Sequence, residues 1–171
     1  GAMPWGSIDP IVISAEIIEA LQHIVSRESD LTKAPLVISI GSLHSGVRAN
    51  IIPETAEMLG TIRSLDATMR KETHEKMRRV VQHIAQSAGA TATIEINTQT
   101  MINYNDPRLA KKSVNALNKA AGADNVMESR WTTAAEDFSF YGDKAPSFFF
   151  SLGGMQKGKN PTEVGGHHTP D

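Results

Sequence analysis

Two β-prone segments joined by a polar, glycine-containing connection constrain the fold more than any other feature of the sequence. The first runs from Leu36 to Ile40 and is rich in β-branched residues, and the second runs from Ala56 to Leu65 and alternates polar with apolar side chains. Both patterns are typical of β-strands. Glycines such as Gly46 allow the connection to turn sharply or to approach a ligand closely. The pattern predicts a rigid pair of strands whose connection is open to a ligand.

Asn50 and Arg63 are the polar residues that such a strand pair would position for binding. Asn50 carries an amide that both donates and accepts hydrogen bonds, and Arg63 carries a planar guanidinium that suits a carboxylate. The alternative is that Asn50 is a turn former and Arg63 a solvated strand residue. The spacing of the two residues leaves both interpretations open.

Helix signals lie on both sides of the strand pair. Asp9-Pro10 is an N-cap followed by proline and predicts a helix from about Pro10 to Ser26. Its expected buried stripe is Ile11, Ala15, Ile18, Leu21 and Val25. Asp66 caps a second helix that ends at Gly89, with one face made of Met69, Thr73, Met77, Val80, Ile84 and Ala88. Alternation from Thr91 to Ile96 predicts a third strand.

The resulting order is helix, strand, strand, helix, strand. With one more strand in front, it would be the β-α-β-β-α-β order of a ferredoxin-like unit. The fold class is therefore α+β, with an antiparallel sheet that has two helices on one face. Without the first strand, the sheet has an unprotected edge that a partner chain could occupy.

The last third of the chain has a different character. Asp106-Pro107 caps a helix that ends at Gly122, with inward residues Leu109, Ser113, Ala116, Leu117 and Ala120. The apolar run from Phe148 to Leu152 is typical of a strand buried on both faces, which implies a second sheet covered by helices. A glycine- and lysine-rich loop then runs from Gly153 to Gly166.

Composition excludes several classes of function. The net charge is −2 and no basic run is interleaved with aromatics, which argues against a nucleic-acid partner. No apolar stretch is long enough to cross a bilayer, so no membrane partner is expected. The chain has no cysteine, which rules out a disulfide framework, a thiolate zinc site and a cysteine nucleophile within it. This absence fits a cytoplasmic protein.

His167, His168, Glu136 and Asp137 are the residue types of a hydrolytic metal site, because imidazole and carboxylate groups bind zinc or manganese. Their spacing alone is a weak signal, since a catalytic metal needs about three protein ligands. The alternative is that the two histidines belong to a polar chain end and that Glu136 and Asp137 cap a helix beginning near Phe138.

Several short motifs occur together in one order and spacing along the chain. They are Met3-Pro4-Trp5, Ile8-Asp9-Pro10-Ile11-Val12, Gly46 with Asn50-Ile51-Ile52-Pro53, Gly60-Thr61-Ile62-Arg63, Asn105-Asp106-Pro107, Ala135-Glu136-Asp137-Phe138 and His168-Thr169-Pro170-Asp171. Together they resemble the metal-dependent amidohydrolases and peptidases that include hippurate hydrolase, the auxin-conjugate hydrolases and the N-acyl-amino-acid amidohydrolases. The resemblance covers essentially the whole chain.

This resemblance implies a ferredoxin-like lid, or dimerisation, domain in residues 1–100 and an incomplete C-terminal part of a catalytic α/β domain in residues 101–171. It implies a homodimer formed through the lid. By the same resemblance, Asn50 and Arg63 bind substrate and His168 is a metal ligand. It gives Glu136 and Asp137 no role in direct metal binding.

The same family implies further residues that this chain does not contain. Its other metal ligands and its general-base glutamate would lie before Gly1, and one family histidine would immediately precede it, so Gly1 to Met3 is expected to be native sequence. We expect the parent enzyme to hydrolyse an N-acyl or N-aroyl amino acid, or a small peptide-like substrate, with divalent zinc, manganese, nickel or cobalt. This chain alone is expected to bind no metal and to be inactive. The alternative is a non-catalytic ferredoxin-like module for dimerisation or binding.

Overall fold

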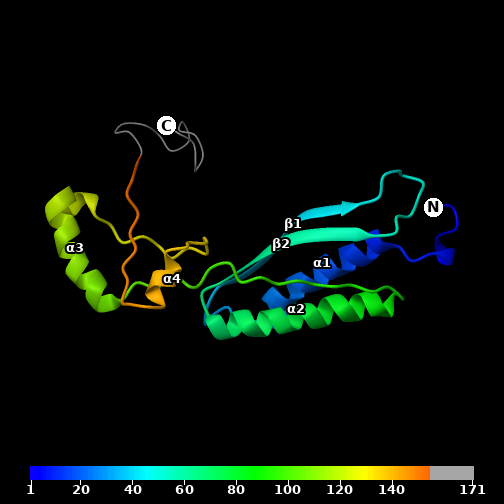
Figure 1. Cartoon of the computed structure of the whole chain (residues 1–171), viewed down its shortest axis with the longest axis horizontal. Helices are drawn as coiled ribbons and strands as arrows, with labels where there is room; N and C mark the ends of the chain where they lie inside the picture. The colour runs from blue at the N-terminus through cyan, green and yellow to red at the C-terminus, as the bar shows by residue number, and fades with distance from the viewer. Residues whose placement is uncertain (155–171) are drawn as a thin grey trace. The chain divides into compact units, whose positions relative to one another are not determined.

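The computed structural model describes residues 1–154, and contacts divide the chain into two units (Figure 1). The first unit contains Gly1–Asn103 and Met127–Phe140. The second contains Tyr104–Val126 and, of the chain that follows residue 140, the described residues 141–154. The predicted division into residues 1–100 and 101–171 stays a prediction.

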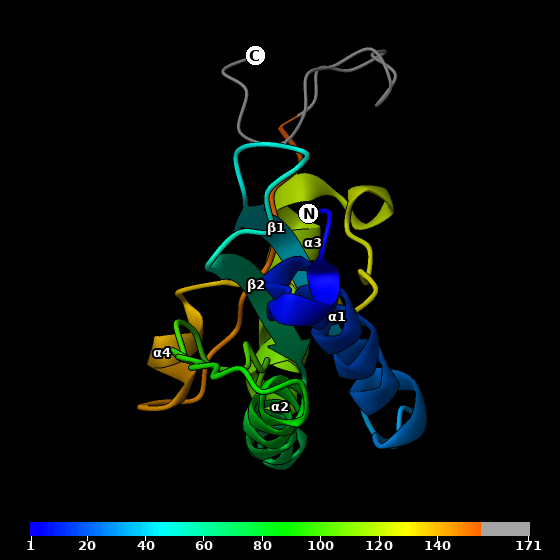
Figure 2. The same ribbon diagram turned by 90° about the vertical axis from the view of Figure 1, so that its right-hand side faces the viewer.

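The first unit is a two-stranded antiparallel sheet with two long helices on one face. Its elements in order are η1 (Pro4–Gly6), α1 (Pro10–Arg27), β1 (Leu36–Ser45), β2 (Ala56–Ser64) and α2 (Ala67–Ser87). Both helices lie on the same side of the strands when the unit is viewed end-on (Figure 2). This arrangement confirms the predicted α+β class.

Both helix starts follow from their caps, as predicted. The Asp9 carboxylate accepts hydrogen bonds from the backbone N–H groups of Ile11 at 2.9 Å and Val12 at 3.4 Å. Asp66 accepts from the N–H of Met69 at 2.7 Å. Beyond the end of α2, Gly89 has a φ of 75°, a left-handed conformation that suits glycine.

The β1–β2 ladder is longer than the sequence suggested. It pairs Leu36 with Ser64 at one end and Ser45 with Ala56 at the other, with an irregularity between Ile40 and Ser42. The predicted end of the first strand at Ile40 is therefore wrong. The bulge at Gly41 absorbs one extra residue, so the small polar residues that follow continue the strand instead of opening a loop.

The core of the first unit lies between the sheet and the helices. Its buried members are Ile13, Ile17, Leu21, Ile24, Ile38, Met77, Val81 and Ala85. Of the stripe expected for α1, only Leu21 is buried, whereas Ile11 is 44% exposed. The prediction failed because the first half of α1 has isoleucine or valine on nearly every face, so more than one apolar stripe fits the periodicity.

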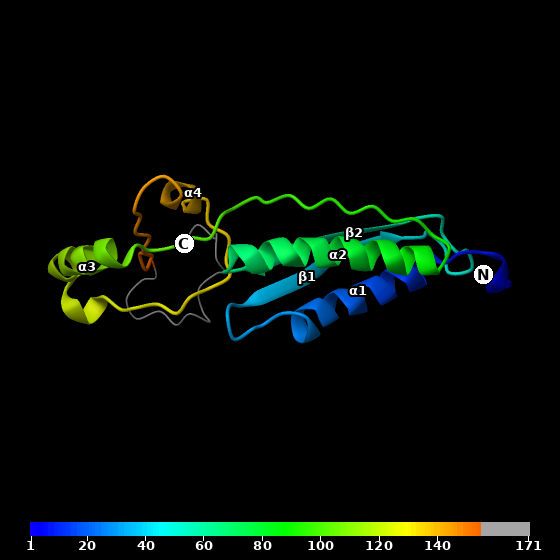
Figure 3. The same cartoon turned by 90° about the horizontal axis from the view of Figure 1, so that it is seen from below.

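Residues 91–96 do not form the predicted third strand. They run back along α2 as an extended trace (Figure 3). Ala92, Ile94 and Ile96 are half-buried and pack against the core, whereas residues 91, 93 and 95 are exposed. The predicted alternation is thus present. The strand is absent because no neighbouring strand within residues 1–154 pairs with this backbone.

The second unit contains α3 (Pro107–Ala121) and η2 (Ala123–Asn125). Asp106 caps α3 by accepting from the N–H of Leu109 at 2.8 Å, and Gly122 ends it with a φ of 85°. These boundaries confirm the predicted helix. Its predicted inward residues are not buried, since Leu109, Ser113 and Leu117 are only partly covered. The remaining two predicted inward residues, Ala116 and Ala120, are exposed.

The apolar run from Phe148 to Leu152 is not a buried strand. Asn105 takes the place of a neighbouring strand: its Oδ1 accepts from the N–H of Phe149 at 2.7 Å and its Nδ2 donates to the carbonyl of the same residue at 2.9 Å. Leu152 is 90% exposed. The part of the chain that the structure describes holds no second sheet to cover this run.

One short helix, α4 (Ser139–Gly142), begins in the first unit and ends in the second. No helix within residues 1–154 has the length and apolar character needed to cross a membrane.

Candidate functional site

Arg63 lies near the end of β2, opposite Val37. Its neighbour Ile62 packs against the core, and successive strand residues point to opposite faces, so Arg63 belongs to the sheet face that the helices leave open. The residue is half-buried. Within residues 1–154 its guanidinium makes no hydrogen bond or ion pair. Its five donors are therefore available to a ligand.

Asn50 lies in the connection between β1 and β2 and is exposed. The carbonyl of Arg48 accepts a hydrogen bond from the N–H of Ile51 at 3.3 Å, which closes a turn around Asn50. The start of the chain lies against this turn, because a Cβ built on Gly1 would be 2.7 Å from the carbonyl oxygen of Asn50. Asn50 is thus a turn former whose side chain is accessible, which leaves a binding role open.

The structure does not bring Asn50 and Arg63 together. Asn50 precedes β2, and Arg63 lies seven residues beyond Ala56, the first residue of that strand. At about 3.4 Å per residue, this stretch of strand is about 24 Å long. A ligand of the size of one acyl-amino acid cannot reach both side chains of a single chain.

Other polar residues share the open face of the sheet with Arg63. Ser39 lies opposite Thr61, and His44 lies opposite Glu57. Sequence reasoning missed the pairing of His44 with Glu57, because the bulge at Gly41 reverses which residues of β1 face outward. A glycine inside a strand pattern is the one signal that could have indicated it.

Glu136 and Asp137 lie in the turn that leads into α4. The Glu136 side chain accepts from the N–H of Phe138 at 3.4 Å, and its carbonyl accepts from the N–H of Ser139 at 3.2 Å. The carbonyl of Asp137 accepts from the N–H of Phe140 at 3.1 Å. The Glu136 side chain thus makes the kind of contact that the capping interpretation expects, whereas Asp137 takes part only through its backbone carbonyl.

His167 and His168 lie outside the described residues, so the predicted metal-ligand role of His168 stays a prediction. Within residues 1–154, no three histidine, aspartate or glutamate side chains come close enough to hold a metal ion. The described part of this chain therefore does not fit a metal centre by itself, because a catalytic ion needs about three protein ligands.

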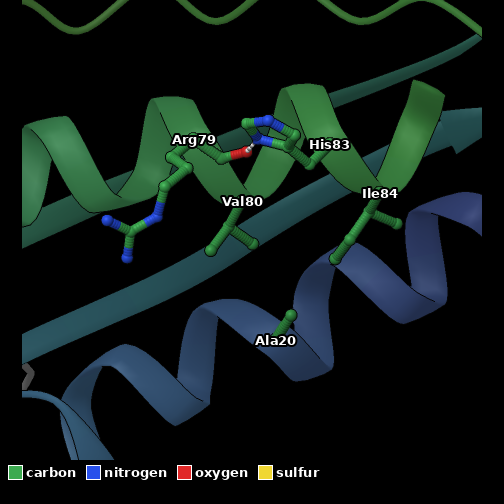
Figure 4. A pocket seen from close by; sticks show the side chains of 5 residues that line it. All are labelled: Ala20, Arg79, Val80, His83 and Ile84. Carbon is green, nitrogen blue, oxygen red and sulfur yellow. Dashed lines mark hydrogen bonds between the residues drawn. The ribbon is translucent and has the colours of Figure 1, made fainter. Parts of the chain in front are cut away.

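A shallow hollow of about 370 Å³ lies between α1 and α2, on the helical side of the first unit (Figure 4). It is lined by Ala20, Arg79, Val80, His83 and Ile84. Its polar groups have structural partners: Arg79 pairs with Glu28 at 3.3 Å, and His83 Nδ1 lies 2.8 Å from the Arg79 carbonyl oxygen. Because Arg63 is on the opposite face of the sheet, this hollow is not part of the candidate site.

The sequence signature of a peptidase dimerisation domain matches residues 1–89. The chain is 40% identical to thermostable carboxypeptidase 2 of Saccharolobus solfataricus over 154 residues, which are 90% of this chain and 38% of that protein. It is 36% identical to N-acetylcysteine deacetylase of Bacillus subtilis, covering 88% of this chain and 39% of the deacetylase.

A solved structure, a dinuclear metal-binding peptidase of the M20 family from Bacillus subtilis, is also similar. It superposes with a TM-score of 0.67 at 30% identity, over 84% of this chain and 36% of the peptidase. The chain thus spans less than two fifths of the curated relatives described above. The match over residues 1–89 shows that the chain belongs to the M20 family of metal-dependent peptidases and amidohydrolases and carries its dimerisation domain.

Proposed function

We propose that this chain is the dimerising and substrate-contacting part of a hydrolase that cleaves the amide bond of N-acyl or N-aroyl amino acids. The observation that carries the proposal is the dimerisation-domain match over residues 1–89. The names of the relatives, a carboxypeptidase and an N-acetylcysteine deacetylase, support the substrate class. Both activities act on an amide next to an amino-acid carboxylate.

Arg63 is the residue proposed to bind that carboxylate. Its guanidinium is half-buried on the open face of the sheet and has no partner within residues 1–154. A planar guanidinium binds a carboxylate through two parallel hydrogen bonds, and such charge-assisted bonds are roughly twice as strong as neutral ones. The partial burial of the side chain lowers the local dielectric constant and so strengthens the interaction.

Asn50 is proposed to contact the substrate of the other protomer. In one chain, the stretch of β2 that separates Asn50 from Arg63 is about 24 Å long. A two-fold dimer allows one substrate to meet Arg63 of one protomer and the partner's Asn50. On this proposal, dimerisation is part of substrate binding and does more than stabilise the protein.

The outer edge of β1 is the proposed dimer interface. Within residues 1–154, β1 pairs with β2 along one edge only. The strand has ten residues and contains no proline or lysine, the residues that commonly protect a sheet edge from pairing with another chain. Two copies of β1 paired antiparallel would join the sheets into one.

In the complete enzyme, we propose a divalent metal, zinc, manganese, nickel or cobalt, with His168 among its ligands. Because residues 1–154 do not assemble a metal site, no catalytic step is assigned to this chain. Taken alone, the chain is proposed to be an inactive dimerisation module. A cytoplasmic location is part of the proposal and is supported by the lack of cysteine in a chain of 171 residues.

The experiment is to graft this chain into the Bacillus subtilis deacetylase in place of its matching segment and to assay hydrolysis of N-acetyl amino acids with added metal. Arg63→Ala should lower kcat/KM by about 10- to 100-fold, the value of a hydrogen bond to a charged group. Arg78→Ala, which removes an exposed arginine from α2, is the matched control. Equal activity of the two variants would contradict the role of Arg63.

A further inference from the structure

The outer edge of β1 is not equally open along its length. The carbonyl oxygen of Ser39 lies 2.5 Å from the position of a Cβ built on Gly60, so this carbonyl points across to β2. Successive residues of a strand direct their backbone N–H and C=O groups to alternate edges. The N–H and C=O groups of Ile38 and Ile40 therefore point away from β2, to the outer edge of β1.

Gln22 occupies one of these outward-facing groups. Its side chain extends from α1, and its Nε2 donates a hydrogen bond to the carbonyl of Ile38 at 3.2 Å. A strand that paired with β1 at this point would need the same carbonyl as an acceptor and the space that the Gln22 amide fills. The Gln22 side chain thus protects the edge around Ile38, as covering loops protect sheet edges in other proteins.

The bulge at Gly41 separates this protected part from the rest of β1. The register between β1 and β2 shifts between Ile40 and Ser42, and a bulge bends its strand and increases the local twist. Beyond the bulge, alternate residues of the stretch 42–45 direct their backbone groups to the outer edge. Within residues 1–154, no side chain forms a hydrogen bond with the backbone of this stretch. The outer edge is therefore open beyond the bulge and covered before it.

We propose that Gln22 sets the register of the dimer: it withholds the edge of residues 36–40, and a second copy of this chain pairs only along residues 42–45. The second copy is the occupant because β1 lies within residues 1–89, which match a dimerisation domain. The two edges then run antiparallel about a two-fold axis close to His44. This inference rests on the proposed dimer interface and specifies the part of β1 that forms it.

Cross-linking of single cysteines tests this register, because the chain has no cysteine of its own. Each variant carries one cysteine at an exposed position of the open sheet face, either Ser39→Cys or His44→Cys, and is treated with a short bismaleimide. With the axis at His44, the two copies of position 44 are adjacent, whereas the two copies of position 39 are about 34 Å apart along the strands. We expect cross-linked dimer from His44→Cys and little from Ser39→Cys.

The same cysteine variants are then combined with Gln22→Ala. Loss of the Gln22 amide opens the edge around Ile38, so the yield of cross-linked dimer from Ser39→Cys should rise by about 2- to 10-fold, the value of one hydrogen bond. Gln82→Ala, which removes an exposed glutamine from α2, is the matched control and should leave this yield unchanged. Light scattering gives the mass of each variant before the cross-linker is added.

Efficient cross-linking of Ser39→Cys with Gln22 present would overturn the register and leave the β1 interface intact. An unchanged yield from Ser39→Cys after loss of Gln22 would overturn the role of Gln22, even if His44→Cys gives a dimer. A dimer that cross-links at neither position would overturn both the register and the proposed interface.

A monomeric mass with Gln22 present would contradict the dimer of the proposed function and the pairing along residues 42–45. In that case, association of the Gln22→Ala variant with cross-linking at Ser39→Cys would still support the protection of Ile38. A chain that stays monomeric both with and without Gln22 would overturn that protection as well.

Discussion

The Asp66 carboxylate accepts a hydrogen bond from the backbone N–H of Met69 at 2.7 Å, at the start of α2. This hydrogen bond is the main cause that holds the pKa of Asp66 below its usual value. The second cause is the Lys33 ammonium group, which lies 3.2 Å from the carboxylate. A carboxylate whose pKa is lowered in the folded state stabilises the protein at pH values above the ordinary pKa of that carboxylate. That stabilisation is lost as the pH falls through the lowered pKa.

We therefore predict that the melting temperature of the chain falls on acidification below about pH 4, and that Asp66→Asn flattens this fall. Asparagine also caps helices well, so Asp66→Asn should fold normally at pH 7, whereas Asp66→Ala should melt about 2–5 °C lower. The measurement is thermal unfolding followed by circular dichroism between pH 3 and 7. If the melting temperature of Asp66→Asn falls with pH as steeply as that of the unchanged chain, the stabilising role of the Asp66 carboxylate is contradicted.

The surroundings of His74 lead to a second, separate prediction for how stability depends on pH. Burial, and after it the charges of Arg78 and Arg70, lower the pKa of His74 below its usual value. The unfolded chain then binds a proton at a pH where the folded chain does not, so stability falls as the pH drops below about 6.5. His74→Gln should reduce this fall below about pH 6.5. Gln82→Ala, an exposed change on the same helix that removes no ionisable group, is the control and should leave the fall unchanged.

The sequence predicted the elements whose signals are local. Asp9, Asp66 and Asp106 each precede a helix and cap it as expected. The predictions that proved wrong concern strands, whose formation depends on contacts with distant parts of the chain. Residues 91–96 alternate like a strand, but strand pairing needs a neighbour, and Phe148 to Leu152 would need a second sheet to be buried.

The arrangement of the candidate site could not be predicted from the sequence, and its chemistry stays a prediction. The residue types of Asn50 and Arg63 fit a hydrogen-bonding amide and a carboxylate-binding guanidinium, and they also fit a turn former and a solvated strand residue. Asn50 lies in the connection before β2 and Arg63 lies near the end of that strand, and their separation depends on how far β1 and β2 remain paired. The pairing continues past the bulge at Gly41 to Ser45. A single insertion in one strand of a pair changes the facing residues without leaving a unique mark in the sequence.

Gly60 is predicted to be intolerant of a side chain. A Cβ at this position would lie 2.5 Å from the carbonyl oxygen of Ser39 and 2.9 Å from Ile40 Cδ1. Because the nearest atom is backbone, the strands must move apart, which costs about 1–3 kcal/mol. Gly41→Ala is the matched control, since no atom lies within 4 Å of its built Cβ. Urea unfolding should show a lower midpoint for Gly60→Ala, and equal midpoints for the two variants would contradict the predicted clash.

Ile24 and Ile11 distinguish the observed buried stripe of α1 from the one expected from periodicity. Ile24 is 0% exposed and belongs to the core, whereas Ile11 is 44% exposed. Ile24→Ala removes a fully buried side chain and leaves a cavity, so it should lower the free energy of unfolding by about 2–5 kcal/mol. Ile11→Ala makes the same chemical change at the partly exposed position and should cost less than about 1 kcal/mol. Urea unfolding of both variants checks the difference, and a larger loss for Ile11→Ala would mean that α1 is rotated about its axis relative to the sheet.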